Sequence, residues 1–346
     1  LAEPDEVVDV ERLQQAGARV IAVPLPKWQS LANSLLAIPR GLPMQARYSW
    51  QPALAGRIDA LLVSGERYDV IHVEHLRGAE YGRHLLGDRQ PRGAPALPPV
   101  VWDSVDCISH LFRQSARNRG TSLKSRATAA FELVSTSRYE RRAVETFDRV
   151  LVTSPVDRAE LAKLGRADRP DGKIDVVPNG VDLRYFTPGS TERHADTIVI
   201  SGKMSYHANV AMVKQLIGEI MPLVWAQRSD IKVQIVGKDP PPAIRAMGEN
   251  PNVQVTGTVS DIRPYLQQAT LAVAPITYGA GIQNKILEAM ACATPVVASP
   301  RAVSALLAAP GHEVLVAETP HQCADAILDL LNNPHRQREI GAAGRA

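Results

Sequence analysis

The sequence predicts an α/β protein built from two Rossmann-like domains, and three observations support this fold class. Short apolar runs typical of buried strands alternate with helical segments along most of the 346 residues. A stretch at 183–195 that contains Pro, Gly, Ser and Thr interrupts the alternation and has the composition of a linker. The alternation then resumes at Thr197. We therefore expect domains of 1–185 and 186–346 that face each other across a cleft.

The composition is that of an ordinary globular protein. With 45% hydrophobic and 22% charged residues, the chain can bury two large cores, and its net charge of +3 does not demand a nucleic-acid partner. The three cysteines form no C-x-x-C pair, which argues against a zinc site or a disulfide framework. No apolar run approaches the ~18 residues of a membrane span, and the acidic first residues are unlike a signal peptide. We expect a cytoplasmic location.

The first domain is expected to begin inside an α/β alternation. Helical periodicity is found at 6–16, 52–62, 108–147 and 155–164, and strand-like runs occur at 19–23, 68–75, 99–103, 148–154 and 173–177. Because the pattern opens on a helix and closes within one, we expect the first strand to be missing and the given chain to be truncated at both ends.

Polar residues gather at the ends of two predicted strands of this domain: His72, Glu74, His75, Asp103, Ser104 and Asp106. The carboxyl ends of strands in open parallel sheets face the ligand crevice, so these residues are the candidates for chemistry in the first domain. Each of them, taken alone, is more often a structural polar group, and their gathering at carboxyl ends is what favours a site. Their spacing matches no catalytic triad or metal site.

Two segments of the first domain are each open to two interpretations. The stretch 28–50 is weakly amphipathic, as in helices at membrane surfaces, or else forms a solvated connection. The helical segment 108–147 is rich in arginine, which suits an anionic acceptor or membrane, or else forms a solvated face paired with Glu140 and Glu145. Peripheral contact with an anionic membrane, at its inner face, is therefore one expectation.

The second domain restarts the alternation, with strands expected at 197–202, 231–236, 253–255, 271–274, 295–298 and 313–316 and a helix at 209–227. Glycines follow three of these strands, at Gly202, Gly237 and Gly257, where the backbone approaches a ligand or turns without a Cβ. Lys203 directly follows Gly202, so a cation stands where a phosphate could bind.

The stretch 271–299 predicts a strand, a glycine-containing turn, a helix over 282–292 and a further strand. One side of this helix is polar or small: Gly281, Asn284, Lys285 and Glu288. The other side is apolar: Ile282, Ile286, Ala289 and Ala293. Free N–H groups at a helix start, a lysine and a glutamate that accepts from sugar hydroxyls suit a nucleotide diphosphate. The alternative is an ordinary surface helix with an i,i+3 pair between Lys285 and Glu288.

Several enzyme motifs are absent from the sequence. No two aspartates are separated by a single residue, so no D-x-D pair can hold a divalent ion against a diphosphate. We expect no metal, and lysines, arginines and helix N-termini must then neutralise a diphosphate. The sequence also has no Walker A, G-x-S-x-G or H-E-x-x-H motif, which argues against P-loop hydrolysis, α/β-hydrolase chemistry and zincin proteolysis.

Five segments, in their order and spacing, resemble the retaining glycosyltransferases of family 4: VVPNGVDLRYF, SGKMSYHANV, VQIVG, VTGTVSDIRPYL and GIQNKILEAMACATPVV. The resemblance is close over residues 147–331 and looser earlier, where YDVIHVEHLRGAEY and VVWDSVD are similar to the branch that includes sugar transferases of exopolysaccharide clusters. It implies a GT-B fold, in which the second domain binds most of a nucleotide-diphosphate sugar and the first binds most of an acceptor.

The resemblance also assigns roles to residues of the second domain. Glu288 matches the glutamate that bonds the nucleotide ribose, and Lys203, beside Gly202, takes the place of a basic phosphate contact. The nucleobase would lie near Thr258 and Val259. The amides near the distal phosphate and the sugar would come from one turn: Gly281, Ile282 and Gln283.

Three departures from the family pattern concern the donor. Ala280 stands where the family's glutamate contacts the donor sugar, and Ala293 stands where a glycine is usual. The second basic residue expected after Lys203 is not evident. We expect Asn284 and Lys285 to take over part of the role of the glutamate that contacts the donor sugar in the family.

The resemblance implies a retaining, metal-independent transfer of a sugar from a nucleotide-diphosphate sugar to a glycan or lipid-linked acceptor, in extracellular or cell-surface polysaccharide synthesis. The nucleotide sugar is a co-substrate, and no other cofactor is expected. Lys203 and Lys285 would stabilise the departing diphosphate, and Asp103 and His75 would contact the acceptor. Two alternatives stay open: a nucleotide-sugar 2-epimerase of the same fold, and a non-catalytic nucleotide-sugar-binding protein.

Overall fold

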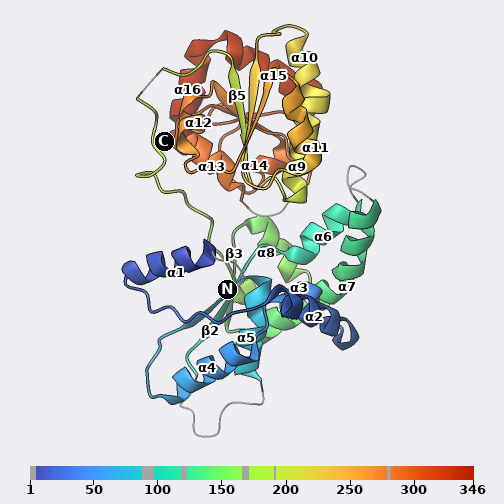
Figure 1. Cartoon of the computed structure of the whole chain (residues 1–346), viewed down its shortest axis with the longest axis vertical. Coiled ribbons are helices and arrows are strands. Elements are labelled where there is room, and N and C mark those ends of the chain that lie inside the picture. Colours follow the sequence, from blue (N-terminus) through green and yellow to red (C-terminus); the bar gives the residue numbers. More distant parts are fainter. Residues whose placement is uncertain (1–4, 88–96, 118–122, 166–170, 191, 279–281) are drawn as a thin grey trace. The chain divides into compact units, whose positions relative to one another are not determined.

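The computed structural model of the chain describes residues 5–87, 97–117, 123–165, 171–190, 192–278 and 282–346. The chain divides into two compact units: Leu1–Arg117 with Ser122–Val177 form the first, and Pro178–Ala346 form the body of the second. Each unit is a parallel β-sheet with helices packed on it (Figure 1). The predicted fold class, an α/β protein of two Rossmann-like domains, is confirmed.

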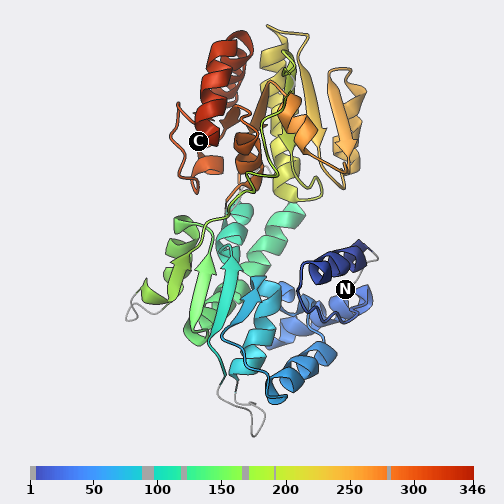
Figure 2. The ribbon, with the colours of Figure 1, turned by 90° about the vertical axis from the view of Figure 1, so that its left-hand side faces the viewer.

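The sheet of the first unit has four parallel strands in the order β1-β2-β3-β4. They are β1 (Ile71–Glu74), β2 (Val100–Val105), β3 (Arg149–Val152) and β4 (Ile174–Val176). Figure 2 shows the strands side by side. Glu74 lies opposite Asp103 in the register of the first pair, so the carboxyl ends of β1 and β2 meet at one edge of the sheet.

Helices connect and cover these strands. Those that follow β1 are α5 (His75–Leu86), α6 (Ile108–Arg117), α7 (Leu123–Thr146) and α8 (Pro155–Ala162). Those that precede it are α1 (Asp5–Gln15), α2 (Lys27–Ala37), α3 (Met44–Tyr48) and α4 (Pro52–Val63). Short 3₁₀ turns are found at Ile38–Arg40 and Asp171–Lys173.

Two interpretations of the sequence of this unit are wrong. The stretch 19–23, predicted as a strand, is irregular and belongs to neither described sheet. A short apolar run becomes a strand only where a neighbouring strand pairs with it through backbone hydrogen bonds. The spacing of apolar residues does not show whether such a strand is present. The stretch 28–50 is not a solvated connection, because it forms α2 and α3, and α3 packs on α2 and α5.

The core of the first unit forms around two large aromatic side chains. Trp102 of β2 and Phe147, which follows α7, are fully buried with their ring centroids 5.9 Å apart. Gly82 of α5 packs so closely on Phe147 that an added Cβ would overlap the ring. The Trp102 indole N–H donates to the carbonyl of His75 at 3.3 Å, which ties the core to the first residue of α5.

Two buried carboxylates hold the connection between β2 and α6. Glu140 of α7 accepts hydrogen bonds from the backbone N–H groups of Ile108 at 2.7 Å and Ser109 at 3.2 Å, and Asp157 of α8 accepts from the N–H of Cys107 at 2.9 Å. Glu140 is therefore a structural residue of the interior rather than a partner of arginines on a solvated face. Burial raises the pKa of Glu140 to about 7, although its hydrogen bonds oppose the shift.

The first unit is expected to lose stability as the pH rises. Glu140 binds its proton more tightly in the folded protein than in the unfolded chain, where its pKa is 4.5. Its contribution to the free energy of unfolding, about 3 kcal/mol, is present below that value and is lost as the pH rises through about 7. Urea unfolding followed by tryptophan fluorescence should show about 2 kcal/mol of this loss between about pH 5.5 and about pH 8, because the loss already begins above pH 4.5.

Two variants test this assignment. Glu140→Gln keeps an oxygen acceptor but cannot ionise, so the free energy of unfolding should vary much less with pH. Glu145→Gln, at an exposed position on the same helix, should behave like the unmodified protein. A pH dependence that persists unchanged in Glu140→Gln would contradict the assignment.

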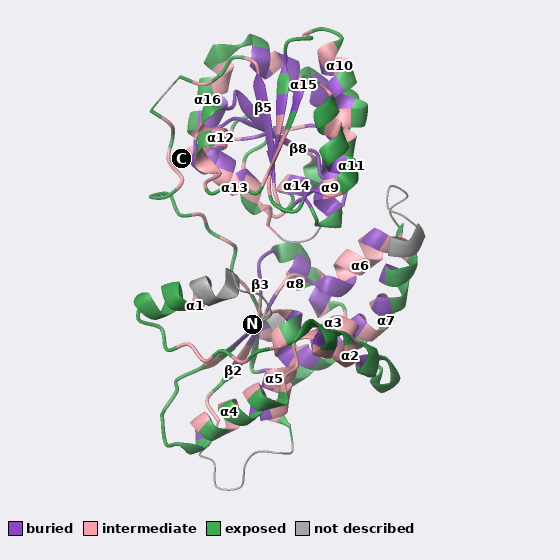
Figure 3. Cartoon of the chain, viewed as in Figure 1, coloured by how far each residue is buried: buried purple, intermediate pink, exposed green. Residues whose placement is uncertain are grey.

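The second unit contains a six-stranded parallel sheet in the order β10-β9-β8-β5-β6-β7. Its strands are β5 (Thr197–Ser201), β6 (Lys232–Val236), β7 (Val253–Gly257), β8 (Leu271–Ala274), β9 (Val296–Ala298) and β10 (Leu315–Val316). Every residue of β5 and β8 is buried (Figure 3). The chain proceeds to one side from β5 and to the other from β8, and α/β sheets bind ligands outside the carboxyl ends at such a switch point.

Helices lie on both sides of this sheet. Figure 1 shows α9 (His207–Gln215), α10 (Met221–Trp225) and α11 (Pro242–Arg245) on one side of β5. It shows α12 (Arg263–Gln268), α13 (Asn284–Ala291) and α16 (Pro334–Arg345) on the other. The remaining elements are a π-helical turn Leu216–Ile220, a 3₁₀ turn Ala246–Glu249, α14 (Pro300–Val303) and α15 (Pro320–Asn332).

The stretch 183–195, predicted as a linker, is irregular but anchored to the second unit by Arg193. The guanidinium donates to the carbonyl of Cys292 at 2.7 Å, of Leu266 at 2.9 Å and of Ala269 at 3.0 Å. These carbonyls belong to the ends of α12 and α13, so one side chain joins the start of the unit to two of its helices.

Candidate functional site

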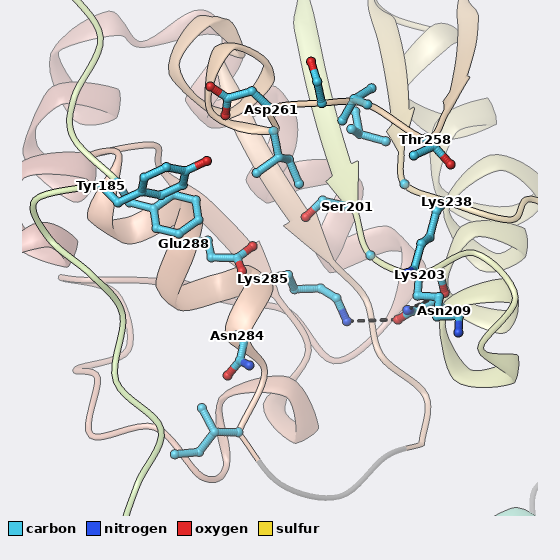
Figure 4. Close-up of a pocket in the computed structure, with 18 residues that line it drawn as sticks. Tyr185, Ser201, Lys203, Asn209, Lys238, Thr258, Asp261, Asn284, Lys285 and Glu288 are labelled. Carbon is cyan, nitrogen blue, oxygen red and sulfur yellow. Dashed lines mark hydrogen bonds between the residues drawn. The ribbon is translucent and has the colours of Figure 1, made fainter. Parts of the chain in front are cut away.

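A cavity of about 600 Å³ opens at the carboxyl ends of β5 and β6, beside the start of α13 (Figure 4). Its volume is in the range of small-molecule binding sites. Eight residues predicted for the site line it: Gly202, Lys203, Thr258, Val259, Ile282, Asn284, Lys285 and Glu288. Gln283 contacts one of these, because its Oε1 accepts from Lys285 Nζ at 3.2 Å. Gly281 and Ala280 lie outside the described residues.

Two glycines bring the turns after β5 and β6 together in the cavity wall. The N–H of Gly202 donates to the carbonyl of Val236 at 3.0 Å, and the N–H of Met204 donates to the carbonyl of Lys238 at 2.9 Å. Gly237 has φ +151°, and an added Cβ would overlap the carbonyl oxygen of Gly202. The close approach of the two turns therefore requires glycine at position 237.

Helix α13 presents one face to the sheet and another to the cavity. Ile286 and Ala289 are fully buried, as the apolar spacing predicts. Ile282 lies just before the helix and lines the cavity. Lys285 and Glu288, on the opposite face, line it too. The helix therefore begins at the cavity and carries two charged side chains into it.

Lys285 is held toward α9 rather than in a surface ion pair with Glu288. Its Nζ donates to Asn209 Oδ1 at 2.9 Å and to Gln283 Oε1 at 3.2 Å. Burial lowers the pKa of Lys285 to about 8, and the Glu288 charge partly opposes this shift. Burial also raises the pKa of Glu288, which the Lys285 charge opposes. Both groups are thus partly desolvated, and an anionic ligand would restore favourable interactions to Lys285.

Several lining residues were missed by the sequence analysis: Tyr185, Phe186, Ser201, Asn209, Val236, Lys238, Ser260, Asp261 and Ile262. A signal existed for Lys238, because it follows Gly237 as Lys203 follows Gly202. Tyr185 had none, since it lies in a stretch of linker composition. The Arg263 guanidinium lies over the Tyr185 ring, 4.0 Å from the ring centroid, so Tyr185 packs against the start of α12.

His75 and Asp103 belong to the first unit and are not among the residues that line this cavity. His75 has φ +63°, and Val105, which donates its N–H to Asp103 Oδ1 at 3.0 Å, has φ +65°. Such left-handed conformations are costly for non-glycine residues and cluster at functional sites. The buried Nδ1 of His75 has no hydrogen-bond partner among the described residues. Burial lowers the pKa of His75, so its ring is neutral at pH 7.

Three of the other polar candidates of the first unit have partners within it. Ser104 Oγ donates to the carbonyl of Asp106 at 2.8 Å, and His72 Nε2 lies 3.7 Å from Asp103 Oδ2. Burial and the Asp157 charge raise the pKa of Asp106 to about 6. Ser104 is therefore bonded within the unit, whereas His75 and Asp103 lie at the ends of β1 and β2.

The charges of the cavity suit an anionic ligand that also carries hydroxyl groups. Lys203, Lys238 and Lys285 supply cations from three elements. Glu288 and Asp261 supply carboxylates that can accept hydrogen bonds from hydroxyls. Cations close to carboxylates in one small-molecule cavity fit a ligand with phosphate and sugar parts.

Two family models match the chain. Residues 2–180 match the model described as "Glycosyl transferase 4-like domain", and residues 195–333 match the one described as "Glycosyl transferases group 1". The first match alone covers more than half of the chain. The chain therefore belongs to this family of glycosyltransferases, and the predicted family is confirmed.

Curated relatives agree with this class. D-inositol 3-phosphate glycosyltransferase of Frankia alni is 28% identical over 234 residues, covering 60% of this chain and 56% of the relative. A GDP-mannose-dependent monoacylated alpha-(1-6)-phosphatidylinositol monomannoside mannosyltransferase of Corynebacterium glutamicum is 25% identical over 270 residues, covering 71% of this chain and 70% of the relative. The chain spans about half the length of the first curated relatives it matches.

Solved structures share the fold. The structure of Anabaena Alr3699/HepE in complex with UDP and glucose aligns with a TM-score of 0.66 and 16% identity. The alignment covers 97% of this chain and 83% of that one. The fold is GT-B, as predicted.

Proposed function

We propose that the chain transfers a sugar from a nucleotide-diphosphate sugar to a glycan or lipid-linked acceptor, with retention of configuration and without a metal. The observation that carries the proposal is the cavity of the second unit, where Lys203, Lys238 and Lys285 surround a space that Glu288 also faces. Three cations can neutralise a diphosphate, and the carboxylate can accept from a ribose hydroxyl. The solved Anabaena relative was crystallised with UDP and glucose, which agrees with this class of donor.

The proposed step exchanges one bond at the anomeric carbon of the donor for another. The bond to the diphosphate breaks, and its electron pair leaves with the phosphate oxygen toward Lys203 and Lys285. The acceptor hydroxyl forms the new bond on the same face, and its proton passes to an oxygen of the departing diphosphate. The largest contribution of such a site is to stabilise the negative charge that develops on the departing diphosphate. The site can do this because its hydrogen-bond donors and cations are in place before the reaction begins. Thr258 and Val259 would lie beside the nucleobase.

We place the acceptor at the first unit, near His75 and Asp103. Neutral His75 presents a buried ring nitrogen that has no hydrogen-bond partner in the described parts of the chain, and Asp103 presents a carboxylate at the end of the next strand. Relatives named for D-inositol 3-phosphate and for a phosphatidylinositol mannoside motivate a phosphorylated or lipid-linked acceptor. Cell-surface polysaccharide synthesis, in the branch of exopolysaccharide sugar transferases, is the role we propose.

The products of a labelled nucleotide sugar test this function. The protein is incubated with the sugar-labelled nucleotide, with and without a lipid extract and with and without a chelator. We expect labelled lipid or glycan only when the extract is present, and equal yield with the chelator. An epimerised nucleotide sugar formed without the extract would contradict the transferase and favour a 2-epimerase. Binding without any turnover by the full-length protein would favour a non-catalytic binding protein.

We further propose that α2 contacts an anionic membrane from the cytoplasmic side. Four of its apolar residues are exposed: Trp28 by 71%, Leu31 by 62%, Leu35 by 65% and Leu36 by 53%. A single helix that exposes this much apolar surface marks an interaction site, and basic residues near its ends, Lys27 and Arg40, suit anionic headgroups. No helix in the described parts of the chain combines the length and the apolar character needed to cross a membrane.

Replacing two of these residues should release the protein from membranes. Trp28→Ser with Leu35→Ser removes apolar area that is already exposed, so the free energy of unfolding should hardly change. The amount of protein that sediments with vesicles containing phosphatidylglycerol should fall about tenfold relative to the unmodified protein. Val63→Ser, at an exposed apolar residue of α4, is the matched control and should sediment normally. Equal sedimentation of all three proteins would contradict the contact.

A further inference from the structure

Asn209 of α9 joins two walls of the cavity through a single side chain. Its Nδ2 donates to the carbonyl of Lys203 at 2.9 Å, and its Oδ1 accepts from Lys285 Nζ at 2.9 Å (Figure 4). The side chain is buried, with only 6% of the residue exposed. One amide therefore connects the turn after β5 to α13.

The chemistry of the two partners fixes the direction of this amide. A carbonyl oxygen can only accept and an ammonium group can only donate, so Nδ2 must face Lys203 and Oδ1 must face Lys285. The reversed amide would place oxygen against oxygen and N–H against N–H. Aspartate at position 209 would lose the donor, and alanine would lose both hydrogen bonds.

Gly202 keeps the room that this pair needs. An added Cβ there would lie 2.7 Å from Asn209 Nδ2 and 3.3 Å from Lys285 Cε. The glycine after β5 thus permits the amide and the lysine stem to pass over the turn. The three residues form one packed unit in the cavity wall.

We propose that Asn209 is a positioning residue that holds the Lys285 ammonium where the donor diphosphate binds. The inference rests on the proposed function and deepens it. The cation that binds phosphate, Lys285, lies on α13, and its position is set by the amide of Asn209 on α9. Without Asn209, the only hydrogen bond recorded for Lys285 within the described chain would be the one to Gln283. Burial would then favour the neutral amine.

Other charged side chains face the same space and are left unchanged by substitutions at Asn209: Lys203 after β5, Lys238 after β6, Asp261 before α12 and Glu288 on α13. His207, also on α9, is engaged with the Tyr278 hydroxyl at 2.7 Å. Because Asn209 also holds the carbonyl of Lys203, the effect of the amide on Lys285 is read from the titration of Lys285 itself.

The test measures the charge of Lys285 and the binding of inorganic pyrophosphate in the same proteins. The rate at which Lys285 is acetylated is measured by mass spectrometry at a series of pH values. Because only the neutral amine reacts, this rate gives the midpoint of Lys285 deprotonation. We expect the midpoint to fall by about one pH unit in Asn209→Ala and to rise in Asn209→Asp, where a carboxylate faces the ammonium. Pyrophosphate affinity of Asn209→Ala should fall about tenfold at about pH 8.5 and much less at about pH 6.5.

A merely structural role predicts a different pattern, with equal loss of affinity at both pH values and an unchanged midpoint in both variants, and that result would overturn the inference. Asn332→Ala, at an exposed position in the same unit, is the control and should match the unmodified protein. Thermal melting establishes that each variant is folded. If the unmodified protein binds neither pyrophosphate nor a nucleoside diphosphate, the proposed function fails, whereas the acetylation midpoints still decide whether Asn209 sets the charge of Lys285.

Discussion

Replacing Lys285 with alanine is expected to lower kcat/KM about a hundredfold, the usual effect of removing one donor aimed at developing charge. The Lys285 ammonium lies in a largely buried place in the cavity wall, where water screens its charge little. Among the described residues that line the cavity, its loss leaves Lys203 and Lys238 as the cations for the departing diphosphate. Steady-state kinetics with the nucleotide sugar that the protein turns over measures this loss, and calorimetry with the matching nucleoside diphosphate measures the loss in binding.

A surface lysine of the same unit provides the control for this experiment. Lys232 begins β6, at the opposite end of the strand from the cavity, and its side chain is 63% exposed beside Asp196. Lys232→Ala should keep full activity, because a surface ion pair contributes little. If Lys285→Ala binds and turns over the donor as the unmodified protein does, then Lys285 has no part in the site.

Replacing Gly237 with alanine is expected to destabilise the second unit by about 3 kcal/mol and to abolish donor binding. The new Cβ would overlap the carbonyl oxygen of Gly202, and backbone cannot move aside as a flexible side chain can. Relieving the overlap must separate the turns after β5 and β6, which carry Lys203 and Lys238. Urea unfolding followed by Trp225, the sole tryptophan after residue 177, measures the change in this unit.

Gly218→Ala is the matched control for this prediction. Gly218 is exposed in the π-helical turn after α9, and an added Cβ there meets nothing within 4 Å. Alanine at a helical position without strain should be neutral or slightly stabilising. If Gly237→Ala is as stable as Gly218→Ala and still binds nucleotide, then the two turns do not approach as described.

The parts of the fold that depend on local pattern could be predicted from the sequence. Continuous apolar runs marked β5 and β8, because strands buried on both faces carry few polar residues. The spacing of Ile286 and Ala289 gave the buried face of α13. Gly202 and Gly237, directly after strands, marked two turns that line the cavity and approach closely, whereas Gly257 ends β7 and an added Cβ there would meet nothing within 4 Å.

The parts that depend on distant neighbours could not. The run at 19–23 has the composition of a strand, but no described strand pairs with it, and pairing is a property of the fold. Asn209 lies in a segment that suggested the family, yet its importance comes from Lys285, 76 residues away. Tyr185 enters the cavity wall because Arg263 packs over its ring, which the linker composition around it did not indicate.

The location of the donor site is the central claim, and a lysine footprint tests it most directly. The protein is acetylated with and without UDP, GDP or ADP, and the modification of each lysine is read by mass spectrometry. We predict that at least one of these nucleotides protects Lys203 and Lys285, whereas Lys163 and Lys173 of the first unit are modified equally in both conditions. Protection of lysines elsewhere, or no protection of Lys203 and Lys285 by a nucleotide that demonstrably binds, would contradict the account.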